Sequence, residues 1–127
     1  MPAAEALSEP ARAGLAAKRI FFGHQSVGEN ILAGLSDLAG EDPTLPLRLV
    51  ALSEARLQPG GFFSHAQVGR NGDPAGKTND FARLLDEGVA GRLDVAFHKY
   101  CFVDVTASAD VRSLFHHYES VMERLRA

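Results

Sequence analysis

The pattern of apolar and polar residues in the first third of the chain predicts a helix, a strand and a second helix. Residues 4–17 are rich in alanine, which is typical of a helix. A short apolar run over residues 19–22 stops at Gly23, which predicts a strand. Apolar residues then recur with helical spacing until Gly40. These residues are Val27, Ile31, Leu35 and Leu38.

A second strand and a long loop are predicted next. The strand covers residues 47–52, where apolar residues dominate. Residues 53–76 are rich in glycine and polar residues, which favours a long loop containing at most a short helical turn. Asn79 is placed to cap the following helix.

The last third of the chain predicts a buried strand and an amphipathic helix. Residues 94–105 are nearly continuous in apolar and aromatic residues, as buried parallel strands are. Ser108 or Asp110 then caps a final helix with one clear apolar face. The alternation of helices and strands predicts an α/β fold, with a parallel sheet between two layers of helices.

Three predicted strands are few for this architecture. We therefore expect residues 1–127 to form a single α/β domain that is the N-terminal part of a larger one, truncated after the third strand and the following helix. The exposed edge of such a sheet would favour self-association. Ligands bind outside the carboxyl ends of parallel strands. This rule brings together residues 24–26, the 53–76 loop and residues 100–104.

Composition narrows the possible partners. The chain is 46% hydrophobic and 23% charged with a net charge of −3, and it has no basic block, so neither a nucleic acid nor a membrane is expected as a partner. No signal peptide is visible, which leaves the cytoplasm as the default compartment. Cys101 is the only cysteine, which excludes an internal disulfide and a multi-cysteine zinc site. We expect no metal and no cofactor.

A serine follows the first predicted strand at its turn into a helix. His24, Gln25 and Ser26 occupy this corner. The N–H groups and the positive dipole end of the next helix would stabilise an oxyanion there. Two interpretations stay open: Ser26 or Gln25 caps the helix, or Ser26 is a nucleophile whose proton is taken by a base.

Other candidate residues are less specific. The segment NGDPAGKT (71–78) is close to a phosphate-binding loop, but Asn71 stands where that motif has its first glycine, so nucleotide binding is a minor alternative. Backbone N–H groups at Gly76 and Lys77 could still face an anion. Lys99 lies near the end of the third strand and either snorkels to solvent or has a buried partner.

The five histidines divide into three groups. His24 and His65 could meet near the predicted site, although their spacing matches no metal motif. His98 is expected to lie within the sheet. His116 and His117 are expected on the solvated side of the last helix.

Taken together, residues 19–115 resemble the SGNH, or GDSL-like, hydrolase family. Gly-His-Gln-Ser at 23–26 resembles the Gly-Asp-Ser motif that carries the nucleophile, but it is one residue longer and has no aspartate. NGDPAGKTNDFARLL (71–85) is similar to the second block of the family. Only Asp104 matches the Gly-x-Asn-Asp block, and the Asp-x-x-His block that supplies the base is absent from the chain.

The resemblance implies a flavodoxin-like, SGNH-type sandwich and a serine hydrolase. Ser26 would attack an ester or acetyl-ester carbonyl, such as that of an acetylated carbohydrate. The N–H groups of Ser26 and Gly76 would hold the oxyanion, helped by the Asn71 side chain. The residues assigned to oxyanion and substrate binding are Gly76, Asn71, His24, Gln25, Lys99 and Asp104.

The missing Asp-x-x-His block predicts that these 127 residues alone have little or no hydrolase activity. The alternative from another class is a non-catalytic domain of the same fold, which would hold a small anion or a sugar at the same edge.

Overall fold

The computed structural model of the protein describes residues 7–55, 57–89 and 92–126. It is an α/β fold built on a four-stranded parallel sheet in the order β2-β3-β1-β4. The strands are β1 (Arg19–His24), β2 (Leu49–Ala51), β3 (Phe62–Gln67) and β4 (Val95–His98). The helices are α1 (Glu9–Ala17), α2 (Val27–Glu41), α3 (Leu52–Ala55), α4 (Pro74–Leu84) and α5 (Val111–Arg126). A π-helical turn η1 (Leu85–Val89) extends α4, and a 3-10 turn η3 (Phe102–Asp104) follows β4.

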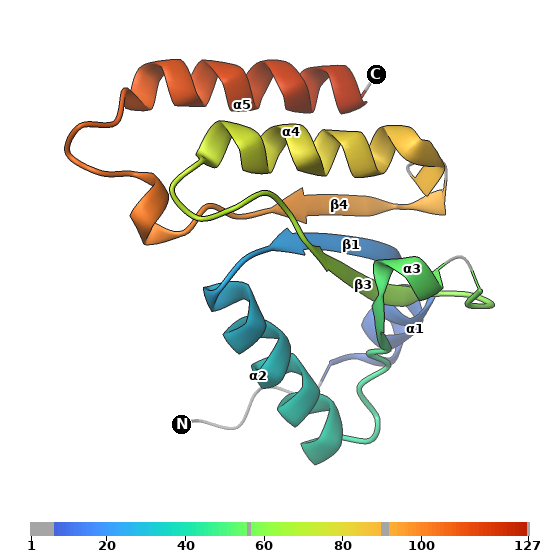
Figure 1. Ribbon diagram of the computed structural model, residues 1–127. Coiled ribbons are helices and arrows are strands. Elements are labelled where there is room, and N and C mark those ends of the chain that lie inside the picture. The colour runs from blue at the N-terminus through green and yellow to red at the C-terminus, as the bar shows by residue number, and fades with distance from the viewer. Residues whose placement is uncertain (1–6, 56, 90–91, 127) are drawn as a thin grey trace.

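The predicted parallel sheet between helical layers is confirmed. Figure 1 shows α2 on one face of the sheet and α4 with α5 on the other. Alternation along β1 sends its side chains into two separate cores. Phe22 packs with Leu32 of α2 and with Phe63. Phe21 packs against α4, where its ring stacks on Phe81 with the centroids 5.6 Å apart.

The prediction of a loop over residues 53–76 is wrong in its central part, because β3 lies there. β3 pairs with β1 along its whole length, from Arg19 opposite Phe62 to His24 opposite Gln67. Ser64 makes the strand look polar, yet it is fully buried and its Oγ donates to the Ile20 carbonyl oxygen at 2.7 Å. The sheet therefore has four strands rather than the expected three.

Two other boundaries also differ from the prediction. The helix expected from Asn79 begins at Pro74, because Asp73 caps it and accepts the Gly76 N–H at 3.0 Å. The strand expected to reach residue 105 ends at His98. Beyond it, the Cys101 N–H bonds the Asp104 carboxylate at 2.7 Å instead of a neighbouring strand, and the chain forms η3.

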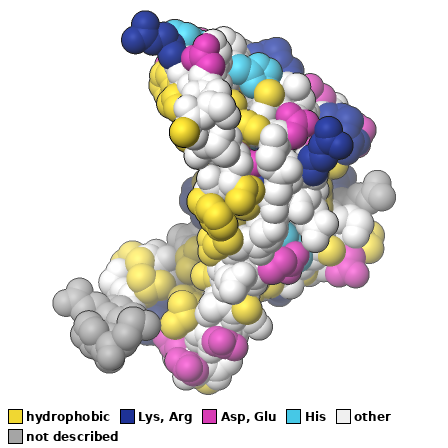
Figure 2. All heavy atoms as spheres, turned by 60° about the vertical axis from the view of Figure 1, so that its left-hand side comes forward, with side chains coloured by type: hydrophobic (Ala, Val, Ile, Leu, Met, Phe, Trp, Pro, Cys, Tyr) yellow, Lys and Arg dark blue, Asp and Glu magenta, His cyan; other side chains and the backbone are white. Residues whose placement is uncertain are grey.

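Part of the sheet face that carries α2 is left uncovered. Val95 and Phe97 of β4 are 45% and 41% exposed, and Val27 and Ile31 of α2 are exposed as well. Figure 2 shows hydrophobic side chains gathered near the middle of the face that it presents. Among the described residues β4 pairs only with β1, so its outer edge is open. Within the same part of the chain, every helix is too short or too polar to span a bilayer.

Candidate functional site

Three segments meet at the carboxyl edge of the sheet, as the order of the elements predicts. Gln25, which follows β1, donates from Nε2 to the carbonyl oxygen of Gly69, which follows β3, at 2.8 Å. Cys101, after β4, points its Sγ at the Gln25 carbonyl oxygen at 3.8 Å. The Gly72 N–H donates to Asp104 Oδ1 at 2.7 Å, which joins the second and third segments.

Ser26 has an unusual backbone at this corner. Its φ of 37° and ψ of −98° make it the only non-glycine with positive φ among the described residues. Such a conformation costs on the order of 1–3 kcal/mol and is found mostly at functional sites. Ser26 precedes α2 as its N-cap, but its side chain makes no capping hydrogen bond. Neither side chain therefore caps the helix as the capping interpretation expects: the Ser26 hydroxyl makes no capping bond, and the Gln25 side chain is bonded to the Gly69 carbonyl oxygen.

The Ser26 hydroxyl is bonded to Asn71. Asn71 Nδ2 lies 2.5 Å from Ser26 Oγ, and Asn71 Oδ1 accepts from Lys77 Nζ at 2.8 Å. An ammonium group can only donate, so the asparagine oxygen must face Lys77. The amide nitrogen must then face Ser26, whose Oγ accepts and keeps its own hydrogen free to donate.

Lys77 is held by a buried ion pair. Its Nζ lies 2.5 Å from Asp104 Oδ2, and both side chains are 0% exposed. Burial by itself raises the pKa of Asp104. Hydrogen bonds from Lys77 and from the N–H groups of Cys101 and Gly72 outweigh this effect, so the pKa lies below its ordinary value. Asp104 is therefore an ionised partner for Lys77 and also anchors the turn that carries Asn71.

Burial of the Lys77 side chain was not predicted from the sequence, because the helix was expected to start at Asn79 and starts at Pro74. Lys77 and Phe81 lie four residues apart on one face of α4, and both are buried. Once Asp73 and Pro74 are taken as the start of the helix, this spacing indicates burial of Lys77. The buried lysine considered at Lys99 is thus at Lys77 instead.

Several candidate residues have other contacts. The Gly76 N–H is bonded to Asp73, so it is not free to hold an oxyanion in this arrangement. Lys99 Nζ lies 3.5 Å from Cys101 Sγ. Thr78 Oγ1 bonds the Tyr100 hydroxyl at 2.7 Å. The lysine and threonine of the phosphate-loop alternative are therefore both engaged inside the protein.

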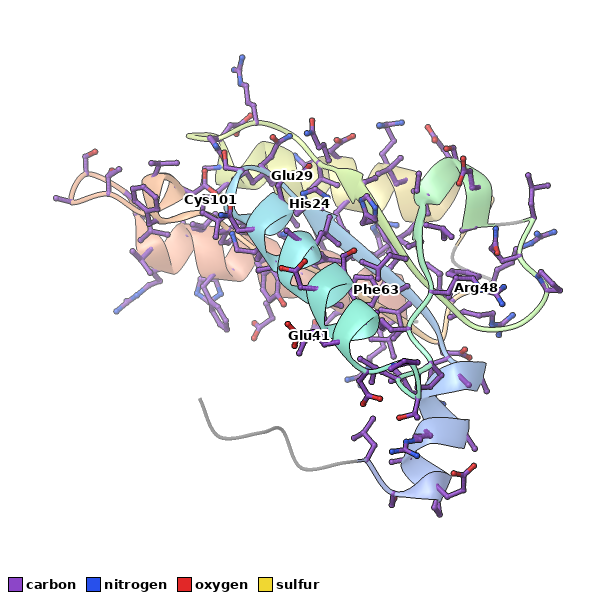
Figure 3. The ribbon with its side chains drawn as sticks, turned by 90° about the horizontal axis from the view of Figure 1, so that it is seen from below. His24, Glu29, Glu41, Arg48, Phe63 and Cys101 are labelled. Carbon is purple, nitrogen blue, oxygen red and sulfur yellow. The ribbon has the colours of Figure 1, made fainter. Side chains whose placement is uncertain are left out.

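The predicted approach of His24 and His65 is present. His24 is 1% exposed, and its Nε2 lies 3.4 Å from His65 Nδ1. Its Nδ1 lies 3.8 Å from Glu29 Oε1 (Figure 3). Burial lowers the pKa of His24, aided by His65 and Lys99 and opposed by Glu29, so the ring is neutral at pH 7. Gly28 makes room for the ring, since a Cβ there would come within 2.2 Å of His24 Cβ.

The remaining histidines lie apart from Ser26. His98 lies against Phe81 and Tyr118, and burial lowers its pKa to about 4. His116 is exposed as expected. The expectation that His117 is solvated is wrong, because its ring is half-buried and its Nε2 has no hydrogen-bond partner among the described residues.

A hollow of about 680 Å³ is lined by His24, the last residue of β1, and by the polar side chains of His65, Glu29 and Gln67. Ser26 and Asn71 are not among the residues that line it. Its size lies within the range of small-molecule sites. Among the described residues, no group of three or more His, Cys, Asp or Glu side chains could hold a metal ion.

No protein-family model, no curated protein and no solved structure matches the chain. The site combines a strained serine with an amide donor fixed on its Oγ by a buried ion pair, and a buried His24 contacts His65 where both line a hollow. No histidine of the described residues hydrogen-bonds Ser26 Oγ.

Proposed function

We propose that the protein is an SGNH-like serine ester hydrolase of the flavodoxin-like type, with Ser26 as its nucleophile. One observation carries the proposal: Asn71 donates to Ser26 Oγ and is held in that orientation by Lys77. A capping serine would need neither this donor nor a buried ion pair behind it. The strained backbone of Ser26 supports the same conclusion.

In the proposed mechanism the oxyanion donor is the side-chain amide of Asn71, because the backbone N–H of Gly76 is bonded to Asp73. Ser26 Oγ attacks the ester carbonyl carbon, and the negative charge develops on the carbonyl oxygen next to the Asn71 amide. The N–H groups at the start of α2 lie at the same corner and add positive partial charge. Donors held in position in this way stabilise an oxyanion without reorganising during the reaction.

A base for the Ser26 proton is the part of the mechanism that the described residues do not supply. Their only side-chain hydrogen bond to Ser26 Oγ comes from Asn71, which is not a base. The chain also has no Asp-x-x-His block. We therefore expect little ester turnover from these 127 residues until a base is supplied.

The hollow that His24 helps to line favours a polar ester. Side chains of His65 and Gln67 can bind hydroxyl groups, and Leu52 and Leu84 provide apolar contact. An acetylated carbohydrate has both kinds of surface and fits the volume. The substrate class proposed is an ester or acetyl ester of a polyhydroxy compound.

Labelling with a fluorophosphonate tests whether Ser26 is a nucleophile. The protein is incubated with the probe, with and without added imidazole as an external base, and adducts are located by mass spectrometry. Ser26 Oγ would displace fluoride from phosphorus while imidazole takes the proton. We expect an adduct on Ser26 that needs imidazole, is absent in Ser26→Ala and is much reduced in Asn71→Ala. Ser36, exposed on α2, is the internal control. Equal labelling of Ser26 and Ser36 would overturn the proposal.

The second candidate is a non-catalytic binding domain of the same fold. It is favoured by one observation, a hollow lined by polar side chains in a protein whose described residues place no base on Ser26 Oγ. In that case imidazole produces no Ser26 adduct, while a sugar ligand still binds. Binding that is unaffected by Ser26→Ala, together with absent labelling, would favour this candidate.

A further inference from the structure

A carboxylate and two imidazoles form a line next to the hollow, separate from the Asn71 contact of Ser26. His24 and His65 lie on neighbouring strands and project from the face of the sheet that carries α2. Glu29 approaches from the first turn of α2. The three side chains contact each other in the order Glu29, His24, His65, with separations of 3.8 Å and 3.4 Å.

The protonation of His24 follows from its neighbours. A neutral imidazole carries one proton, on either Nδ1 or Nε2. If Nε2 carried it, the buried lone pair of Nδ1 would face the Glu29 carboxylate, and both groups would be acceptors. With the proton on Nδ1, this contact becomes attractive. The Glu29 side chain is 57% exposed, so it can rotate to shorten 3.8 Å to a hydrogen bond.

This assignment also determines the tautomer of His65. His24 Nε2 is then an acceptor, so His65 Nδ1 must carry the hydrogen that lies between the two rings. His65 Nε2 is left with a lone pair. No described residue hydrogen-bonds this nitrogen, and it is not one of the fully buried side-chain atoms that lack a partner, so part of its surface is accessible. The His65 ring lines the hollow. The lone pair of Nε2 is therefore open to a ligand.

We propose that the line Glu29–His24–His65 presents the unprotonated Nε2 of His65 to the hollow as a base, and that this nitrogen accepts a hydrogen bond from a hydroxyl group of a bound polyhydroxy ligand. The ligand hydroxyl keeps its proton, because an alkoxide is a far stronger base than imidazole. Glu29 acts through His24: it holds the hydrogen of His24 on Nδ1, which leaves His24 Nε2 as the acceptor for His65 Nδ1–H.

The ligand class follows from the other groups in the hollow. Gln67 and Ser53 line it and can each donate to and accept from further hydroxyl groups. No step of this proposal involves Ser26. It therefore holds or fails independently of the ester hydrolase proposal, and Ser26→Ala should leave every measurement below unchanged.

Nitrogen-15 NMR of the histidine side chains tests the line of tautomers directly. We expect both His24 and His65 to carry hydrogen on Nδ1, although free histidine favours Nε2. Glu29→Ala should move His65 toward the Nε2–H form. Glu87→Ala is the matched control, because Glu87 lines the same hollow without facing His24, and it should change nothing. A wild-type His65 with hydrogen on Nε2, or identical spectra for wild type and Glu29→Ala, would overturn the proposal.

Diethyl pyrocarbonate tests the reactivity of the free lone pair. It modifies unprotonated imidazole nitrogen, and mass spectrometry reports the rate at each histidine. We expect His65 to react at least about threefold more slowly in Glu29→Ala. Glycerol, a small triol, should protect His65 but not the exposed His116. No slowing in Glu29→Ala refutes the assigned base, and no selective protection refutes the polyhydroxy ligand.

Discussion

Replacing Lys77 by methionine tests whether a buried ion pair holds the Ser26 corner in place. Lys77 and Asp104 have no exposed side-chain surface, and Nζ lies 2.5 Å from Oδ2. Methionine has a similar volume but leaves Asp104 charged, with only the N–H groups of Gly72 and Cys101 as donors. Removing one partner of a buried pair costs about 3–5 kcal/mol. Because two donors remain, we expect a loss of about 3 kcal/mol in the free energy of unfolding.

A double-mutant cycle separates the pair from the two individual side chains. Asp104→Asn removes the negative charge and leaves the buried Lys77 ammonium with neutral acceptors such as the Asn71 oxygen, and should also cost about 3 kcal/mol. The double variant Lys77→Met/Asp104→Asn leaves no unpaired charge. Its loss should therefore fall short of the sum of the single losses by at least about 2 kcal/mol. Urea denaturation followed by far-ultraviolet circular dichroism measures each value.

Arg83→Met is the matched control on the same helix. Arg83 pairs with Asp80 at the surface, so its loss should change stability by at most about 0.5 kcal/mol. If Lys77→Met is no more destabilising than Arg83→Met, the pair is not buried as described. If the two single losses simply add, Lys77 and Asp104 are not coupled, and the orientation of Asn71 needs another explanation.

Three further predictions follow from the strain, the buried histidine and the open sheet edge. Ser26→Gly should raise the free energy of unfolding by about 1 kcal/mol relative to Ser26→Ala, because glycine tolerates positive φ; equal stabilities in urea would contradict the strain. Burial lowers the pKa of His98 from 6.5 to about 4, so its stabilisation is complete above pH 6.5 and is lost as the pH falls toward 4. Because His98 is partly exposed, we expect this loss in the free energy of unfolding to be about 2 kcal/mol. In His98→Gln, the urea midpoint should no longer fall between pH 6.5 and pH 4 for this reason. Phe97→Glu should weaken self-association in sedimentation velocity, and a purely monomeric wild type would contradict the prediction.

Elements with strong local patterns could be predicted from the sequence. The apolar run that contains Phe21 and Phe22 lies in β1, and α2 follows with regular apolar spacing, so the corner at Ser26 was placed correctly. α5 has the clearest apolar face and starts one residue after Asp110, whose Oδ1 accepts the Ser113 N–H at 3.0 Å. In each case the signal lies within a few residues of the element it defines.

β3 was missed because its partners are distant in sequence. Ser64, His65 and Gln67 read as loop residues, and the apolar part is only Phe62 and Phe63. What makes Ser64 acceptable in the sheet is its bond to a carbonyl of β1, 44 residues away. A hydrogen bond between residues so far apart cannot be predicted from the local order of apolar and polar residues.

The Ser26 site was only partly predictable for a related reason. The start of α4 could be read from the pair Asp73-Pro74, since aspartate is a common cap and proline a common first residue. The partner of Lys77 could not be predicted, because Asp104 lies 27 residues away and approaches only through the turn after β4. Spacing could show that Lys77 is buried but not what neutralises it.

The strained backbone of Ser26 and the buried Lys77–Asp104 pair both lower the stability of the fold, and both bear on the position of Ser26 Oγ. A positive φ at Ser26 and a fully buried Lys77–Asp104 pair each lower stability relative to simpler alternatives, such as glycine at the corner or apolar side chains in the interior. Neither is needed to start α2, since the Ser26 side chain caps nothing. Asn71 connects them, because Lys77 fixes the amide that donates to Ser26 Oγ. The proposed role of Ser26 as a nucleophile accounts for both departures from the most stable arrangement, since they meet at its hydroxyl.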